Sequence, residues 1–360
     1  MEVTIPVPAV RELVTGMGRI ISSKTFLQYI WVQPEKKGIR FMGTNADETA
    51  VFFCPEATAK GKDGFAINLD ELRIVMREVR GDTLSITVRS NDLDVRFCED
   101  LWNAVVTLEK NVVTEPPFSF DLFTGWEPVE YPNFLSDYRF ALPFCSKDST
   151  RWILNGVCFH EDGSVVATDG RRLVVKREAH PFKLPKSDAK WGNGYVIRES
   201  RWLKNAKPVD GVQATREHLR VKAGDWQYIV KPLDGRFPNY QQVIPEQTPN
   251  QFFELCDDAI RAFRLIEGLL SDRDKCVRLE ALKTKTKLVL NATNHKDNRK
   301  VKIDMEGKGS VTFATGLNVT YMIQALQAGF RKFHQLDNLS PSVSFHEGWQ
   351  HILMPMRVAE

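Results

Sequence analysis

The chain has few cysteines and no paired cysteine motif. Six are scattered over 360 residues, and Cys-x-x-Cys does not occur. This pattern argues against a zinc ribbon or a redox dithiol and favours reduced, mostly buried thiols. The N-terminus lacks the basic and apolar regions of a signal peptide. The longest uncharged stretch, 309–330, is interrupted by glycine, asparagine and glutamine, which is not typical of a membrane span. We therefore expect a cytoplasmic protein with no membrane partner.

A strong charge of either sign is also lacking. Lys and Arg total 49 and Asp and Glu total 46, giving a net charge of +3. A protein that binds nucleic acid through bulk charge is usually far more basic, so any such contact needs a local patch. The length indicates two or three domains, and a hydrophobic content of 42% is ordinary for a globular protein.

Known catalytic motifs are absent from the sequence. There is no Gly-x-x-x-x-Gly-Lys-Ser/Thr, His-Glu-x-x-His or Gly-x-Ser-x-Gly. We interpret 307–310 as a turn between strands and 160–162 as a solvated turn. The acidic pair 257–258 is typical of a helix start, where carboxylates complement the helix dipole. We expect no catalytic residue, metal or cofactor, although an unrecognised enzyme that processes nucleic acid stays an alternative.

The expected elements form a pattern that repeats three times. Apolar periodicity predicts helices over 8–21, 69–79, 134–145, 199–205, 257–270 and 318–328, with strands between them, including 152–160. Proline-rich breaks fall in 111–132 and 234–249. The sequence predicts an α+β protein of three repeated domains, 1–120, 121–247 and 248–360. Each would be an antiparallel sheet with helices on one face.

Basic residues recur on the non-core faces of these helices. Any one group is most simply a solvated face, but its recurrence in each repeat favours a positively lined surface. Such a surface can follow a phosphate backbone without reading sequence. The expected DNA-facing residues are Arg11, Arg19, Lys24, Arg73, Arg77, Arg80, Lys204, Lys207, Arg261 and Arg264.

The segment 164–176 predicts a β-hairpin. Two β-branched runs flank Asp169-Gly170, the preferred chemistry of a two-residue type I′ turn. Arg171 and Arg172 follow the turn. The simplest interpretation of the segment by itself is an ordinary hairpin with a solvated pair of charges.

Four segments in register resemble the bacterial sliding clamp family, the DNA polymerase III beta subunits. The hairpin 166–173 resembles the signature hairpin of that family, 151–157 its preceding strand, 233–245 its loop into the third domain and 354–357 its C-terminal tail. The segment 316–321 is a weaker match. The resemblance covers the whole length and is strongest from about residue 151. Gln242 stands where many clamps have arginine, and the slightly basic balance departs from a commonly acidic family, as in a divergent or secondary clamp.

The resemblance implies a head-to-tail dimeric ring around double-stranded DNA, with helices lining the inner face and sheets outside. It implies a non-catalytic processivity factor that tethers the DNA polymerase III catalytic subunit, the clamp loader and clamp-binding repair proteins. A bacterial, nucleoid-associated location in the cytoplasm follows. A clamp-fold scaffold that binds peptides without encircling DNA is the nearest alternative.

The resemblance also implies two sites. The ring interface would use Ala104 and Val106 of one subunit and Leu269 and Leu270 of the other. A partner-peptide groove between the second and third domains would be lined by Leu154, Thr168, Gly170, Arg171, Arg172, Leu173, Pro238, Gln242, Val243, Asn318, Tyr321, Ile352, Met354, Pro355, Met356 and Arg357. The flexible methionines there would form an adaptable apolar socket.

Overall fold

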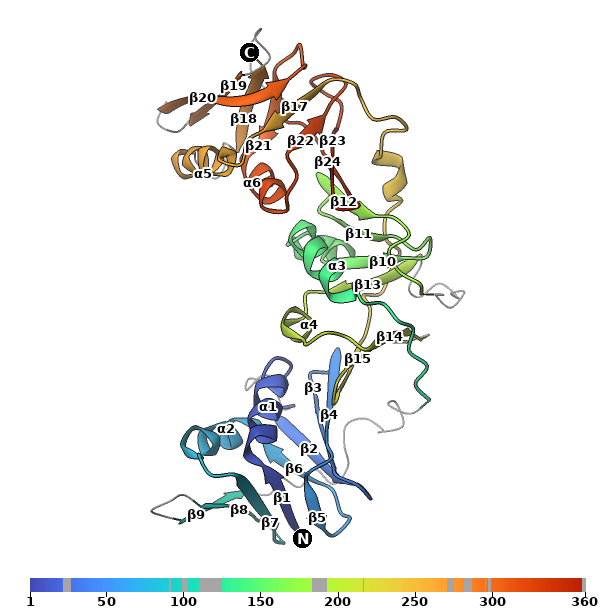
Figure 1. The fold of residues 1–360 in the computed structure, drawn as a ribbon, viewed down its shortest axis with the longest axis vertical. Coiled ribbons are helices and arrows are strands. Elements are labelled where there is room, and N and C mark those ends of the chain that lie inside the picture. The colour runs from blue at the N-terminus through green and yellow to red at the C-terminus, as the bar shows by residue number, and fades with distance from the viewer. Residues whose placement is uncertain are drawn as a thin grey trace. The chain divides into compact units, whose positions relative to one another are not determined.

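Figure 1 shows the computed structural model of the chain. It describes all residues except 22–26, 91, 99–102, 110–124, 183–192, 216, 271–274, 282–286, 295, 297–298 and 358–360. The described residues form two compact units. Unit 1 contains the described residues of 1–135, 181–186 and 199–232, and unit 2 contains those of 136–180, 187–198 and 233–360. The three predicted domain boundaries stay a prediction.

Unit 1 is built from two antiparallel sheets and three helices. The first sheet has the order β5-β1-β7-β8-β9 and the second β14-β15-β16-β4-β3-β2-β6. The helices are α1 (Val7–Met17), α2 (Leu69–Glu78) and α4 (Arg201–Asn205). The strands are β1 (Glu2–Pro6), β2 (Tyr29–Pro34), β3 (Ile39–Thr44), β4 (Glu48–Cys54), β5 (Thr58–Lys60), β6 (Phe65–Asn68), β7 (Thr83–Val88), β8 (Asp92–Cys98), β9 (Asn103–Glu109), β14 (Gly211–Ala214), β15 (Leu219–Ala223) and β16 (Trp226–Val230).

Unit 2 is organised around one antiparallel sheet of twelve strands, in the order β13-β10-β11-β12-β24-β23-β22-β17-β20-β19-β18-β21. Its helical elements are α3 (Phe134–Ala141, from Ser136 on), the 3₁₀ turns η2 (Leu142–Phe144), η3 (Ser149–Leu154) and η4 (Tyr240–Val243), α5 (Ala259–Leu269) and α6 (Val319–Gln327). The strands are β10 (Gly156–His160), β11 (Val165–Thr168), β12 (Arg172–Lys176), β13 (Gly194–Arg198), β17 (Phe252–Leu255), β18 (Cys276–Ala281), β19 (Lys287–Asn294), β20 (Arg299–Gly309), β21 (Thr315–Asn318), β22 (Lys332–His334), β23 (Ser342–His346) and β24 (Trp349–Leu353). The pairing of β12 with β24 joins strands that the sequence places in different predicted domains.

The α+β fold class is confirmed, and each expected range contains most of a helix, although α1 starts one residue before the range 8–21 and ends at Met17, four residues short of its end. Helices α2 and α6 begin where asparagine side chains cap them: Asn68 accepts bonds from the backbone N–H of Asp70 and Glu71, and Asn318 from that of Tyr321. The expected cap at 257–258 is confirmed in position only, because the Asp258 side chain caps no backbone N–H of α5. In Figure 1, α5 and α6 lie side by side against the sheet of unit 2.

Two expectations about strands are wrong. Residues 152–154, expected as the start of the strand 152–160, belong to the 3₁₀ turn η3, which begins where the Asp148 side chain accepts the Thr150 N–H; the strand itself begins at Gly156. The expected turn at 307–310 largely continues strand β20, which pairs through Gly307 and Gly309 with β17. A Cβ at Gly307 would lie 2.8 Å from the carbonyl oxygen of Glu254, so this close pairing needs glycine.

The cysteines placed in the described part of the chain are not joined by disulfide bonds. Cys54, Cys145 and Cys158 are buried, Cys276 is half-buried and Cys256 is exposed, all as free thiols. None of the described helices is long and apolar enough to cross a membrane.

Candidate functional site

The hairpin β11–β12 differs from the expected two-residue turn. Thr168 pairs with Leu173, so four residues, 169–172, make the connection. Only Gly170 among them has a positive φ, of 84°. The Asp169 carboxylate accepts bonds from the backbone N–H of Arg171 at 2.9 Å and Arg172 at 3.1 Å. The type I′ turn is wrong, because the aspartate side chain stabilises a longer loop that needs one left-handed residue instead of two.

Arg172 is buried, which corrects the expectation of a solvated pair of charges. Its Nε donates to Asp169 Oδ2 at 3.0 Å and its Nη2 to the Pro143 carbonyl oxygen at 2.8 Å. The guanidinium lies over the rings of Phe144 and Tyr321, 4.9 and 4.4 Å from their centroids. Burial lowers the pKa of Arg172, and the Asp169 carboxylate opposes that change. Arg171 alone is exposed.

The C-terminal segment is held by backbone bonds to the β11–β12 connection and to strand β21. Met354 N donates to the Arg171 carbonyl oxygen at 3.0 Å, and Met356 N donates to the Gly316 carbonyl oxygen at 2.9 Å. The Met354 residue is 41% exposed, while Pro355 and Met356 are half-buried. The alternative of a plain buried strand for these methionines is therefore wrong, and Met354 presents an apolar surface to solvent.

The residues predicted for the groove all lie in unit 2, and some of them meet in one buried cluster. Leu154, Leu173 and Ile352 pack there with Phe237 and Tyr240, which sequence reasoning did not select. Seven other predicted residues are exposed and lie close to members of this cluster in the sequence: Gly170, Arg171, Pro238, Gln242, Val243, Met354 and Arg357. Two other members shape the backbone. Thr168 Oγ1 donates to the Arg172 carbonyl oxygen at 2.6 Å, and Asn318 caps α6.

A polar network fixes the segment 237–241. The expected solvated turn at 160–162 is confirmed for Glu161 and Asp162, which are exposed, and is wrong for the buried His160. Asp162 Oδ2 accepts from Tyr240 Oη at 2.6 Å and from Gln241 Nε2 at 3.1 Å. His160 is buried, with Nδ1 3.0 Å from Asp162 Oδ1. The Asn193 side chain joins His160 Nε2 to both backbone groups of Phe237. Partial burial would raise the pKa of Asp162, but the hydrogen bonds outweigh it and hold that pKa well below 3.8.

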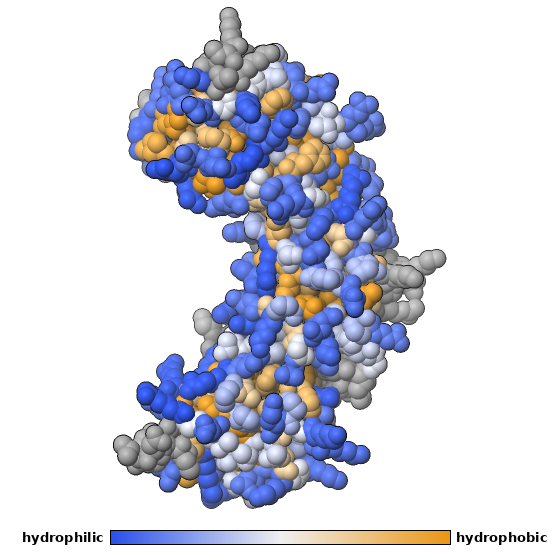
Figure 2. Space-filling view, in the orientation of Figure 1, coloured by the Kyte–Doolittle hydropathy of each residue, from blue (hydrophilic) through white to orange (hydrophobic). Residues whose placement is uncertain are grey.

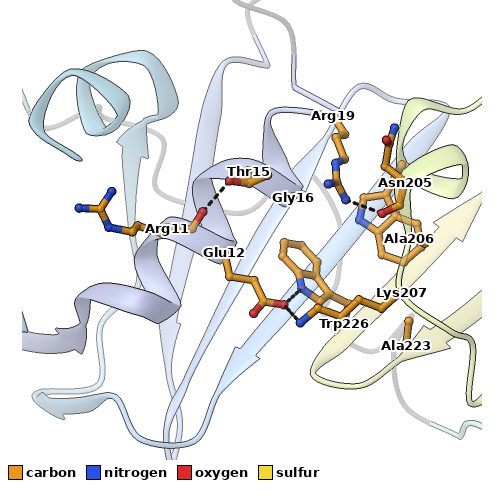
Figure 3. Close-up of a pocket in the computed structure, with 11 residues that line it drawn as sticks. Arg11, Glu12, Thr15, Gly16, Arg19, Asn205, Ala206, Lys207, Ala223 and Trp226 are labelled. Carbon is orange, nitrogen blue, oxygen red and sulfur yellow. Dashed lines mark hydrogen bonds and ion pairs between the residues drawn. The ribbon is translucent and has the colours of Figure 1, made fainter. Parts of the chain in front are cut away.

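Three of the predicted DNA-facing residues line one cleft in unit 1. Arg11, Arg19 and Lys207 border a volume of about 340 Å³ together with Glu12 and Trp226 (Figure 3). Lys207 Nζ lies 2.7 Å from Glu12 Oε1, and Arg19 Nη1 donates to the Asn205 carbonyl oxygen at 3.0 Å. The guanidinium of Arg11 points away and donates to the Val79 carbonyl oxygen. Sequence periodicity found the cations but gave no signal for the cleft.

The other predicted DNA-facing residues are placed individually. Arg73 pairs with Asp70 at 2.6 Å, and Lys204 pairs with Glu199 at 2.6 Å. Arg77 and Arg80 are exposed in unit 1, and Arg261 and Arg264 are exposed on α5 in unit 2. Lys24 lies outside the described residues.

The residues predicted for the ring interface are half-buried, and more exposed apolar side chains lie beside them. On the edge strand β9, Val105 is 57% exposed between Ala104 and Val106. On α5, Leu265 is 56% exposed, one turn before Leu269. Figure 2 shows apolar surface over α5. Side-chain alternation along the strand places Val105 on the face opposite to its neighbours, which position in the sequence alone did not indicate.

Comparison with known proteins gives one consistent result in sequence and in structure. No protein-family model matches the chain. The beta sliding clamps of Salmonella typhimurium and Escherichia coli are each 29% identical over 181 residues, 49% of this chain and 49% of theirs. The clamp of Haemophilus influenzae is 27% identical over 232 residues, 60% of this chain and 61% of its own. The chain thus spans about half the length of the first of these relatives.

Solved structures match over nearly the entire chain. The DNA polymerase III beta subunit of Pseudomonas aeruginosa superimposes with a TM-score of 0.83 at 18% identity, covering 99% of this chain and 100% of that one. The Caulobacter crescentus polymerase III beta structure gives a TM-score of 0.80 at 20% identity, again over 99% and 100%. The predicted resemblance is confirmed: the chain is similar to bacterial beta sliding clamps in fold over 99% of its length and in sequence over about half of it.

Proposed function

We propose that the chain is a DNA sliding clamp, a processivity factor that closes as a head-to-tail dimeric ring around duplex DNA. The observation that carries this proposal is the agreement in fold with DNA polymerase III beta subunits over 99% of the chain. The ring would comprise three domains per subunit and hold a polymerase on its template by topology. Its work is mechanical, so it needs no catalytic group of its own.

The inner surface of the ring would carry the predicted DNA-facing cations. Weak contacts to phosphate oxygens hold a duplex without selecting its sequence, which a sliding protein requires. The cations on α1, α2 and α5 and beside α4 are spread over both units. The ring interface would use the β9 edge and the end of α5, where Val105 and Leu265 add exposed apolar surface.

The groove in unit 2 would accept short peptides from the polymerase catalytic subunit, the clamp loader and repair proteins. The supporting geometry is a buried apolar cluster on which Ile153 and Ile244 pack, with the exposed Val243 next to Ile244 in the chain, the exposed Met354 two residues after Ile352, and the guanidinium of Arg172 fixed over Tyr321. A peptide can bury its apolar side chains against such a surface while the Arg171 side chain and exposed backbone groups orient it. The work of the protein would take place in the bacterial cytoplasm, at the nucleoid.

Retention on DNA tests the topological part of the proposal. The protein, loaded on a nicked circle, should stay bound through gel filtration in moderate salt and leave after the circle is cut. Equal retention on circular and linear DNA would contradict a ring. Light scattering provides an independent measurement, because a stable monomer at working concentrations excludes the dimeric ring.

One observation favours a second candidate, a clamp-fold scaffold that binds peptides and does not encircle DNA. Arg73, Lys204 and Lys207 are each paired with a carboxylate. Such pairing reduces the positive potential available to a phosphate backbone. A monomer that binds partner peptides and is not retained on circular DNA would establish this candidate instead.

A further inference from the structure

We propose that the cleft between α1 and α4 binds one backbone phosphate of duplex DNA, and that Glu12 occupies this site as a competing anion when DNA is absent. The inference rests on the proposed function and assigns a specific site to it. Its elements all lie in unit 1: one face of α1, the end of α4 with Lys207, and the β15–β16 hairpin.

Two donors converge on a single carboxylate oxygen in this cleft. Glu12 Oε1 accepts from Lys207 Nζ at 2.7 Å and from Trp226 Nε1 at 3.0 Å, as Figure 3 shows. Partial burial raises the pKa of Glu12, but these bonds and the charge of Lys207 outweigh burial and lower it. The carboxylate is therefore an anion at neutral pH, held by an ammonium and an indole N–H.

The same donors suit a phosphate oxygen. Phosphate and carboxylate oxygens accept bonds from cationic and backbone-like N–H groups with similar geometry, and charge strengthens both. Arg19 borders the same cleft, where its Nη1 bonds Asn205, and it adds a second cation beside Lys207. The guanidinium of Arg11 points away from the cleft, so two cations, Arg19 and Lys207, face one carboxylate there, and the site favours a second anion or the replacement of the first.

The position of Trp226 depends on a glycine. A Cβ at Gly16 would lie 2.3 Å from both Cη2 and Cζ2 of the indole. Without that Cβ the ring packs directly against α1, which brings Nε1 to the Glu12 carboxylate one turn earlier. The donor pair is therefore fixed by packing.

The Glu12–Lys207 pair is exposed enough to exchange. The side chains are 37% and 69% exposed, and exposed ion pairs are weak because water and salt compete with them. A DNA phosphate can replace Glu12 at Lys207, but Glu12, water and salt compete with the phosphate for that cation. Contact with the duplex stays weak at this position, which suits movement along the duplex.

The test compares two variants with the same change in charge. Glu12→Gln removes the competing anion and keeps an amide oxygen for Trp226 Nε1. Glu199→Gln breaks the 2.6 Å pair with Lys204, which lies on α4 but does not line the cleft. Both full-length proteins are titrated against a short fluorescent duplex by anisotropy, over a series of salt concentrations.

We expect Glu12→Gln to tighten duplex binding about threefold at low salt, the scale of one exposed ion pair. The slope of log K against log salt should steepen by up to about 0.9, for one further phosphate contact. Glu199→Gln should produce less than half of this gain. The gain from Glu12→Gln should disappear in the presence of Lys207→Gln, and circular dichroism should show both single variants folded.

Equal effects of the two glutamate variants would overturn the site, since they would reflect overall charge alone. A gain from Glu12→Gln that persists without Lys207 would also overturn it. Failure of every variant to bind the duplex would reject this site and leave the clamp function to the circular-DNA assay, because a ring holds DNA by topology. Normal duplex binding with equal retention on circular and linear DNA would reject the ring and leave the phosphate site standing.

Discussion

Replacing Gly16 with alanine provides a sharp test of the packing in unit 1, because two effects predict opposite changes in the free energy of unfolding. Gly16 lies inside α1, where alanine is favoured over glycine by about 0.5–1 kcal/mol. Helix propensity alone therefore predicts that Gly16→Ala stabilises the protein. The new methyl group, however, would lie 2.3 Å from two atoms of the buried Trp226 indole.

The steric effect should prevail. Overpacking a well-filled core typically costs about 1–3 kcal/mol, and the Trp226 ring is confined by Phe52, 4.8 Å away between ring centroids. After the gain in helix propensity, we expect a net loss of about 1–2 kcal/mol in the free energy of unfolding of unit 1. Urea denaturation followed by circular dichroism measures the loss, and hydrogen exchange assigns it to α1 and β16.

Gly268→Ala is the matched control. Gly268 occupies a similar place near the end of α5, and a Cβ there would meet no atom within 4 Å. It should stabilise unit 2 by up to about 1 kcal/mol, as propensity predicts. If Gly16→Ala stabilised the protein to the same extent as Gly268→Ala, the close packing of Trp226 against α1 would be refuted.

Two further predictions concern unit 2. Hydrogen bonds lower the pKa of Asp162 in the folded state. The Asp162 carboxylate therefore contributes its full stabilisation above about pH 4, the range of an ordinary aspartate. That stabilisation is lost as the pH falls toward the folded-state pKa. The stability difference between wild type and Asp162→Asn should therefore shrink on acidification in urea titrations; a difference independent of pH would contradict the network with Tyr240. Deletion of residues 354–360 should abolish the binding of a labelled partner peptide in a fluorescence titration and leave the subunit assembly unchanged by light scattering. Loss of assembly instead would contradict the placement of the groove.

Local signals in the sequence were sufficient to find the helices, although not the end of α1, which stops at Met17 instead of continuing to residue 21. The apolar periodicity of α2 and α5 and the capping residue Asn68 depend on contacts within a few residues, which a single sequence displays directly. The start of η3 was missed because Asp148 turns the chain locally, although the β-branched and aromatic residues that follow favour a strand. Helix propensity and capping can be read from neighbouring residues. At the start of η3, the choice between extended and 3₁₀ backbone depended on the single side chain of Asp148.

The candidate sites depended on contacts that no local pattern reveals. The bond from Tyr240 to Asp162 joins residues 78 positions apart, and that from Trp226 to Glu12 spans 214 positions. The sequence could identify the cations of the cleft but not the Glu12 carboxylate that pairs with Lys207. The resemblance to clamps supplied the groove residues, and the structure supplied the reason that Arg172 is fixed among them: an aspartate and two aromatic rings.

The ladder between β12 and β24 has a mechanical consequence. Arg172 pairs with Leu353 and Lys176 with Trp349, and on its other side β24 pairs with β23. A load applied to the tail at Met354 in the direction of β24 would act in shear, across hydrogen bonds that lie perpendicular to the strand. Shear loads many bonds at once, whereas peeling would open them one at a time. A molecule pulling on this tail would transmit its force to the whole twelve-stranded sheet.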